Sequence, residues 1–172
     1  MMRTHALEPA VTDTGRLGGL YRQHAAAAVR LAFLLTGDRA LAEDLVQEAF
    51  VRLAGRFRDL RNPDAFEWYL RRTVVNLARS HFRHARVERR YAEEQRGAVA
   101  GEVEAPTDMG EREALWQALL ALPERQRTAI VLRYYEDLSE AQTADAMQCP
   151  VGTVKSLVSR GMDRLRELVT RE

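Results

Sequence analysis

The segment from Glu136 to Asp163 constrains the fold most strongly, because its spacing is that of two short helices joined by a tight turn. Ser139 and Gln142 form an S-x-x-Q capping box at the start of the first helix. The residues Gln148-Cys149-Pro150 then break the helical pattern. Apolar residues recur at helix-packing intervals on both sides of the break, namely Leu138, Ala144, Met147, Val151, Val154 and Val158. The two helices are therefore expected to share one small core.

Hydrogen-bond donors remain outside that core, close to the start of the second helix. They are Thr153, Lys155, Ser156, Ser159 and Arg160. A helix-turn-helix presents its recognition helix to the major groove of DNA in this way, which makes DNA binding the first hypothesis. The alternative is an ordinary corner of two helices, in which Lys155 and Arg160 are solvated surface charges.

The composition is that of an ordinary globular protein, and it limits the function classes. The formal net charge of +1 means that a nucleic-acid surface has to arise from local segregation of charge. The single cysteine, Cys149, excludes an internal disulfide framework and is typical of a reducing compartment. The most apolar stretch, 25–35, is too short to cross a membrane, and the N-terminus lacks a signal peptide. We therefore expect a cytoplasmic protein with no membrane contact.

Helical periodicity without strand signals predicts an all-α fold of two small helical domains joined by a flexible acidic linker. The predicted segments are a disordered N-terminal stretch at 1–16, a first domain at 17–90, a linker at 91–110 and a second domain at 111–172. Helices are expected at about 17–37, 40–55, 63–86, 111–122 and 124–135, followed by the two described above. The buried stripe of the third helix is expected to contain Phe66, Leu70, Thr73 or Val74, and Leu77.

The third helix is basic, with eight arginines against three acidic residues between positions 61 and 90. Trp68, Asn76 and Phe82 lie among these arginines. Arginines neutralise phosphates, aromatic faces stack on unpaired bases, and an amide can pair with a base edge. The helix therefore suits single-stranded or partly opened DNA. The alternative is that Trp68 and Phe82 are core residues and that the arginines form a solvated face.

The second helix is acidic. Asp44, Gln47, Glu48 and Val51 are spaced at i, i+3, i+4 and i+7 and therefore share one face. A mixed acidic and apolar stripe suits docking on a basic protein helix. Plain solvation is the alternative.

Three stretches resemble the extracytoplasmic-function (ECF) group of sigma-70-type RNA polymerase sigma factors. Their sequences are similar to those of an actinobacterial-type subgroup. LTGDRALAEDLVQEAFVRLAGRF is similar to regions 2.1–2.2, and NPDAFEWYLRRTVVNLARSHFRHARVERR is similar to regions 2.3–2.4. LPERQRTAIVLRYYEDLSEAQTADAMQCPVGTVKSLVSRGMDRLREL resembles region 4. The resemblance implies a factor that binds core RNA polymerase and directs it to minus-35 and minus-10 promoter DNA, assisting promoter melting.

The resemblance also implies roles for individual residues. Asp44, Gln47 and Glu48, with Val51 beside them, match the surface that docks on the coiled coil of the polymerase β′ subunit, and the β flap is a second expected contact. The predicted minus-10 residues are Trp68, Arg72, Asn76, Arg79, Ser80 and Arg83. The predicted minus-35 residues are Thr153, Lys155, Ser156, Ser159 and Arg160. Whether an anti-sigma factor binds the chain stays open.

Three residues depart from the family pattern. Leu157 stands where the family very often has arginine, so either a phosphate contact is missing or a thymine methyl contact is gained. Gln148 replaces the more usual glycine. Gly161 replaces the common alanine, which costs up to about 1 kcal/mol of helix propensity and is expected to loosen the end of the recognition helix.

No pattern indicates catalysis, so we expect no enzymatic activity, no cofactor and no metal. A phosphate-binding glycine loop is absent, and the pair His81 and His84 lacks an acidic or thiol partner nearby in sequence. Two rival interpretations remain. A freestanding helix-turn-helix regulator would bind an operator without polymerase, and a sigma-mimicking decoy would bind an anti-sigma factor without supporting transcription.

Overall fold

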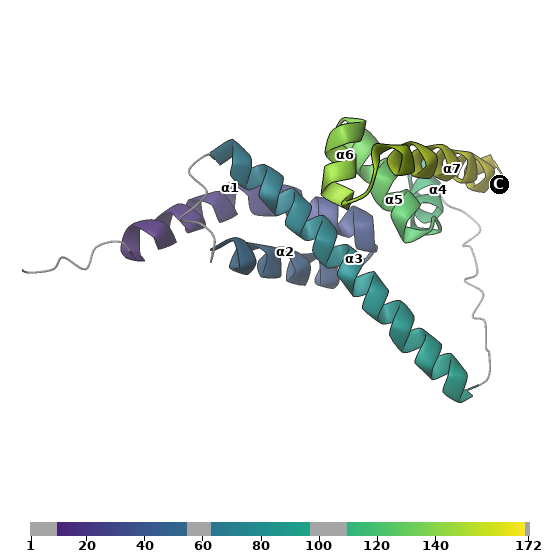
Figure 1. The fold of residues 1–172 in the computed structure, drawn as a ribbon, viewed down its shortest axis with the longest axis horizontal. Helices are drawn as coiled ribbons and strands as arrows, with labels where there is room; N and C mark the ends of the chain where they lie inside the picture. The colour runs from purple at the N-terminus through teal and green to yellow at the C-terminus, as the bar shows by residue number, and fades with distance from the viewer. Residues whose placement is uncertain (1–9, 55–62, 97–109, 171–172) are drawn as a thin grey trace, which may run out of the picture.

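A computed structural model describes residues 10–54, 63–96 and 110–170, and every element within these ranges is helical. The all-α prediction is confirmed. Figure 1 shows the long helix α3 crossing α1 and α2, with the helices α4 to α7 gathered on one side of it.

The first domain consists of α1 (Ala10–Thr36), α2 (Arg39–Ala54) and α3 (Pro63–Arg96). The predicted stripe of α3 is confirmed, because Phe66, Leu70, Val74 and Leu77 are all buried. Thr73 is only half-buried, so Val74 is the core residue of that pair. These side chains belong to one core cluster with buried residues of α1 and α2.

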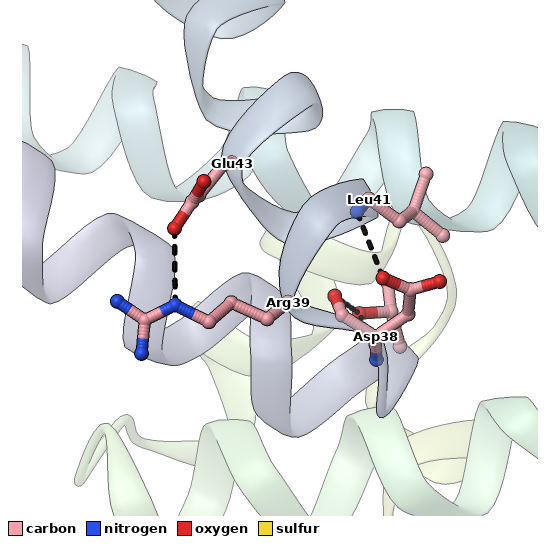
Figure 2. Close-up of polar contacts among 5 residues, drawn as sticks. Asp38, Arg39, Leu41 and Glu43 are labelled. Atoms are coloured by element: carbon pink, nitrogen blue, oxygen red, sulfur yellow. Dashed lines mark hydrogen bonds and ion pairs between the residues drawn. The ribbon is translucent and has the colours of Figure 1, made fainter.

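A tight turn joins α1 to α2. Gly37 adopts φ +74°, a left-handed conformation that favours glycine, and its N–H donates to the Phe33 carbonyl over 2.8 Å. Asp38 then begins α2, since its Oδ1 accepts a hydrogen bond of 3.0 Å from the Leu41 N–H (Figure 2).

Two helices extend beyond their predicted ends. The helix α1 begins at Ala10, so residues 10–16 are helical where disorder was expected. The helix α3 continues to Arg96, so residues 91–96 are helical where the linker was expected. Both extensions lack the apolar periodicity on which the sequence prediction depended. Residues 91–96 are mostly strong helix formers, whereas residues 10–16 include Gly15 and several weak ones. The rest of the predicted N-terminal stretch and most of the predicted linker lie outside the described residues.

The second domain consists of α4 (Glu111–Leu120), α5 (Glu124–Ile130), the π-helix η2 (Val131–Tyr135), α6 (Glu140–Met147) and α7 (Val151–Thr170). The predicted helix over 124–135 therefore changes character in its last turn. The Glu136 N–H donates to the Val131 carbonyl over 3.0 Å, which is the i→i+5 pattern of a π-helix.

The predicted helix-turn-helix is formed by α6 and α7. Both hydrogen bonds of the capping box are present, from the Gln142 N–H to Ser139 Oγ at 3.1 Å and from the Ser139 N–H to Gln142 Oε1 at 2.8 Å. Gln148 ends α6 in the left-handed conformation, with φ +51°. Val151, the first residue of α7, is exposed, contrary to the prediction.

Leu157 and Gly161 lie on the buried face of α7. Leu157 belongs to the core cluster, which argues against the thymine methyl contact, and the missing phosphate contact stays a prediction. A Cβ atom on Gly161 would lie 2.7 Å from Ile130 Cδ1 and 3.2 Å from Gln126 Cβ. The glycine therefore permits close approach of α5 and α7, and α7 continues as a helix beyond it to Thr170.

We expect Gly161→Val to lower the free energy of unfolding by about 1–3 kcal/mol, because the added methyl groups overfill this contact. Chemical denaturation measures the change. Gly152→Val is the matched control, since Gly152 lies on the same helix with no atom within 4 Å of its Cβ position. Equal denaturation midpoints for the two variants would contradict the assignment.

Candidate functional site

The acidic face of α2 is open to solvent. Asp44, Gln47 and Glu48 are exposed, and the Val51 side chain is 73% exposed. The exposed Val51 side chain adds apolar surface beside these carboxylates, and such a mixed face suits contact with another protein. All of the predicted polymerase-binding residues therefore lie together on one accessible surface.

Two arginines that flank this face contribute ion pairs within α2. Arg39 Nε lies 3.1 Å from Glu43 Oε1 (Figure 2), and Arg52 Nη2 lies 2.5 Å from Glu48 Oε1. Both pairs are exposed, and such pairs contribute about 0.2–1 kcal/mol at most sites. They can be exchanged for a partner's basic side chains at little cost. Asp44 has no ion-pair partner among the described residues.

The predicted minus-10 residues form one stripe along α3, although their exposure differs. Arg79 and Arg83 are exposed, whereas Arg72, Asn76 and Ser80 are half-buried. Trp68 is also half-buried and packs against the core cluster, as does Phe82. For these two aromatic residues the structure therefore favours the core alternative in this arrangement of the helices.

The predicted minus-35 residues lie on the N-terminal half of α7. Lys155, Ser159 and Arg160 are exposed, and Thr153 and Ser156 are half-buried. Lys155 Nζ lies 3.5 Å from Glu140 Oε2, and Arg160 donates to Ser156 Oγ over 2.6 Å. Both basic side chains make exposed contacts of this kind, which hold them only weakly.

The helix-turn-helix packs against the minus-10 stripe of the first domain. Arg79 Nη1 donates to the Met147 carbonyl over 3.0 Å, and Arg72 Nη1 lies 3.5 Å from Asp145 Oδ2. Both acceptors are on α6. In this arrangement two of the predicted minus-10 arginines are bound by the other domain.

Arg127 is the central side chain of the domain contact and is only 6% exposed. Its Nε donates to the Leu35 carbonyl of α1 over 2.9 Å, and its Nη1 donates to the Leu120 carbonyl of α4 over 2.7 Å. Both carbonyls lie at helix C-termini, which lack intrahelical donors and favour a cation. Burial lowers the pKa of the Arg127 guanidinium, and Glu124 acts in the opposite direction.

Other contacts support the same interface. Arg71 Nε lies 2.6 Å from Glu136 Oε2, and both side chains are largely buried. The rings of Phe33 and Trp116 stack with centroids 4.9 Å apart, and Arg127 lies over the Phe82 ring at 5.5 Å. Aromatic, cationic and ionic contacts thus combine to hold the two domains together.

The sequence analysis missed Arg127, although a signal was present. Arg127, Ile130 and Val131 are spaced as one helix face, and the two apolar residues are buried. A charge on an apolar stripe indicates a buried polar contact. The sequence cannot show that the acceptor, the Leu35 carbonyl, is a backbone atom of a different domain.

A cleft of about 460 Å³ opens between α3 and the second domain. Arg79 and Arg83 of the minus-10 stripe line it together with Arg160 of the recognition helix. The two predicted DNA-contacting surfaces therefore meet at one place in this arrangement.

Neither a metal site nor a membrane span emerges from the described residues. Within 10–54, 63–96 and 110–170, no three His, Cys, Asp or Glu side chains are arranged to hold a metal ion. No helix of the described part is long and apolar enough to cross a bilayer.

Two protein-family models match this chain, in the order that the resemblance implied. The model described as sigma-70 region 2 matches residues 20–88, and the model described as sigma-70, region 4 matches residues 112–165. The region 2 match contains the acidic face of α2 and the minus-10 stripe of α3, and the region 4 match contains the helix-turn-helix.

Curated relatives and solved structures agree with these matches. The RNA polymerase sigma-E factor of Streptomyces coelicolor is 33% identical, with 85% of this chain and 82% of the relative covered. The ECF RNA polymerase sigma-E factor of Escherichia coli K12 is 31% identical, with 83% and 80% covered. The fold is similar to that of the sigma factor RpoE from Bartonella quintana, solved in complex with the anti-sigma factor NepR, with a TM-score of 0.67, 24% identity and coverage of 90% and 97%.

Proposed function

Because this chain belongs to the extracytoplasmic-function group of sigma-70-type RNA polymerase sigma factors, which act in transcription initiation, we propose that its α2 face docks on core polymerase while α3 and α7 read promoter DNA. The observation that carries this assignment is the exposure of the acidic face around Asp44 and Val51. A basic coiled coil such as that of the β′ subunit complements this face in charge.

The DNA contacts divide between the two domains. Arg72, Asn76, Arg79, Ser80 and Arg83 contact the minus-10 element, where captured unstacked bases assist melting. Trp68 packs against the core beside them. Thr153, Lys155, Ser156, Ser159 and Arg160 contact the minus-35 element. Charge and donor chemistry support both assignments, since arginines bind phosphates and exposed hydroxyl and guanidinium groups read base edges in the major groove.

In this proposal the chain is not an enzyme. It acts in the cytoplasm, where polymerase binds promoter DNA. Its relatives are sigma factors, which are transcription factors. An anti-sigma factor is a further candidate partner, of the kind bound to the Bartonella protein of similar fold.

The domain arrangement has to open before both promoter elements are bound. The positions minus-35 and minus-10 differ by about 25 base pairs, which is roughly 85 Å along B-DNA at 3.4 Å per base pair. In the structure, Arg83 and Arg160 line the same cleft. The contacts of Arg71 and Arg127 with the opposite domain therefore have to break, and polymerase binding supplies the free energy for that separation.

We expect Asn76→Ala to reduce promoter opening about tenfold while leaving polymerase binding unchanged, because one base-edge amide contact contributes about 1–3 kcal/mol. Permanganate footprinting of the minus-10 element measures opening, and a polymerase pull-down measures docking. His84→Ala, an exposed position on the same helix, is the control. Equal loss in both assays would exclude the base-reading role of Asn76.

The overall assignment is tested by transcription in vitro with purified core polymerase over a library of randomised promoters. Start sites that appear only with this protein establish the proposed activity and reveal both promoter elements. Sequence-specific duplex binding without polymerase, combined with no transcripts, would instead indicate a freestanding regulator. Tight binding of an anti-sigma factor with no transcripts would indicate a decoy.

A further inference from the structure

The cleft between the domains is strongly basic. Its lining contains one carboxylate, Glu124, and five arginines, namely Arg79, Arg83, Arg86, Arg125 and Arg160. Arg79, Arg83 and Arg86 are on α3, whereas Arg125 and Arg160 are on the second domain. A cleft lined by one sign of charge concentrates counter-ions, and here it attracts anions.

Most of this positive charge is not neutralised within the described part of the chain. Arg83, Arg86 and Arg125 form none of the ion pairs found there. Arg79 and Arg160 donate to neutral acceptors, the Met147 carbonyl and Ser156. Bringing the domains together therefore places like charges side by side, and a bound anion would relieve that repulsion.

We propose that this cleft binds a linear oligophosphate that bridges the two domains and holds them together. A guanidinium group donates two parallel hydrogen bonds to phosphate oxygens. Successive phosphates of one oligophosphate can therefore bind different arginines of the cleft. The volume of about 460 Å³ is that of a small-ligand site. Leu157 and Pro123 are the apolar side chains of the lining, and neither is aromatic, so the phosphate chain carries the recognition.

The site has a consequence for regulation. Because its arginines come from both domains, the anion binds the closed arrangement and not the opened one. Free oligophosphate therefore stabilises the closed state by mass action, and it competes with any ligand that needs the domains apart.

Isothermal titration calorimetry of the full chain with sodium tripolyphosphate, at constant ionic strength, tests the proposal. We expect one-to-one binding that Arg86→Ala and Arg125→Ala each weaken about tenfold, which corresponds to about 1.4 kcal/mol, since each removes charged hydrogen bonds to phosphate. These two variants remove one arginine from each domain, and neither residue belongs to the predicted DNA-contacting sets. Arg164→Ala, an exposed position on α7 outside the cleft, is the control and leaves the affinity unchanged.

Several results would overturn the proposal. Equal weakening by Arg86→Ala, Arg125→Ala and Arg164→Ala would show only unspecific attraction. Weakening by Arg86→Ala alone would exclude a bridge between domains. ATP is expected to bind about as tightly as tripolyphosphate, and much tighter binding would point to a nucleoside site.

Competition with tripolyphosphate also distinguishes a small-anion site from a nucleic-acid groove. A single-stranded oligonucleotide that displaces tripolyphosphate at lower concentration and depends equally on Arg86 and Arg125 would identify a nucleic-acid groove and overturn the proposal. The thermal midpoint gives a second readout, which rises with tripolyphosphate for the native chain and not for the Arg86→Ala/Arg125→Ala double variant. Neither assay contains polymerase or promoter, so a negative result here leaves the proposed transcriptional function untouched.

Discussion

Reversal of charge at Asp44 and Glu48, to arginine at both positions, is expected to abolish association with core RNA polymerase. Both side chains are exposed on α2, and the substitutions place like charges against a basic partner. Such juxtapositions cost several kcal/mol, which corresponds to at least about a hundredfold loss of affinity. Co-purification with core polymerase, followed by a titration of the affinity, measures the effect.

The fold is expected to survive the reversal. Asp44 has no ion pair in the described residues, and Glu48 loses only the exposed contact with Arg52. A matched control reverses Glu113 and Asp163 to arginine, which changes the net charge equally on exposed positions of the second domain. Undiminished polymerase binding by the α2 variant would place the docking surface elsewhere. Equal loss of binding in the control would show that the effect arises from net charge and not from the α2 face.

Replacement of Arg127 by alanine is expected to lower the free energy of unfolding by about 2–4 kcal/mol and to loosen the domain contact. The change leaves the Leu35 and Leu120 carbonyls without their donors, and a buried unsatisfied acceptor costs about 1–3 kcal/mol. It also removes the contact with the Phe82 ring. Relief of the desolvation that lowers the pKa of Arg127 offsets part of this loss.

Urea denaturation measures the stability change, and small-angle X-ray scattering detects domain opening as a larger radius of gyration. Arg125→Ala is the matched control, since this exposed arginine lies on the same helix and its loss is expected to change stability by no more than about 0.5 kcal/mol. Arg127→Lys keeps the charge but cannot donate to both carbonyls from one planar guanidinium. Its free energy of unfolding is expected to lie between those of the native chain and Arg127→Ala. A native-like midpoint and radius for Arg127→Ala would show that the domains are held by other contacts.

Local patterns were sufficient for much of the fold. The capping box of Ser139 and Gln142 and the stripe of Phe66, Leu70, Val74 and Leu77 were predicted correctly, because each depends on residues close together in one helix. The ends of α1 and α3 were mispredicted, since an amphipathic pattern shows where a helix is packed and not where it ends. The burial of Leu157 was not predicted, because burial on α7 depends on its packing in the core cluster.

By itself, the sequence determined the helical class, the helix-turn-helix and the exposed acidic face around Asp44, all of which follow from spacing along single helices. Only the tertiary structure decided that Arg127 joins two helix C-termini, that Arg72 and Arg79 contact α6, and that arginines of both domains share one cleft. The physical reason is that these contacts join residues far apart in the chain. Backbone carbonyls, which every residue carries, accept some of them, so no residue type marks the partner in advance.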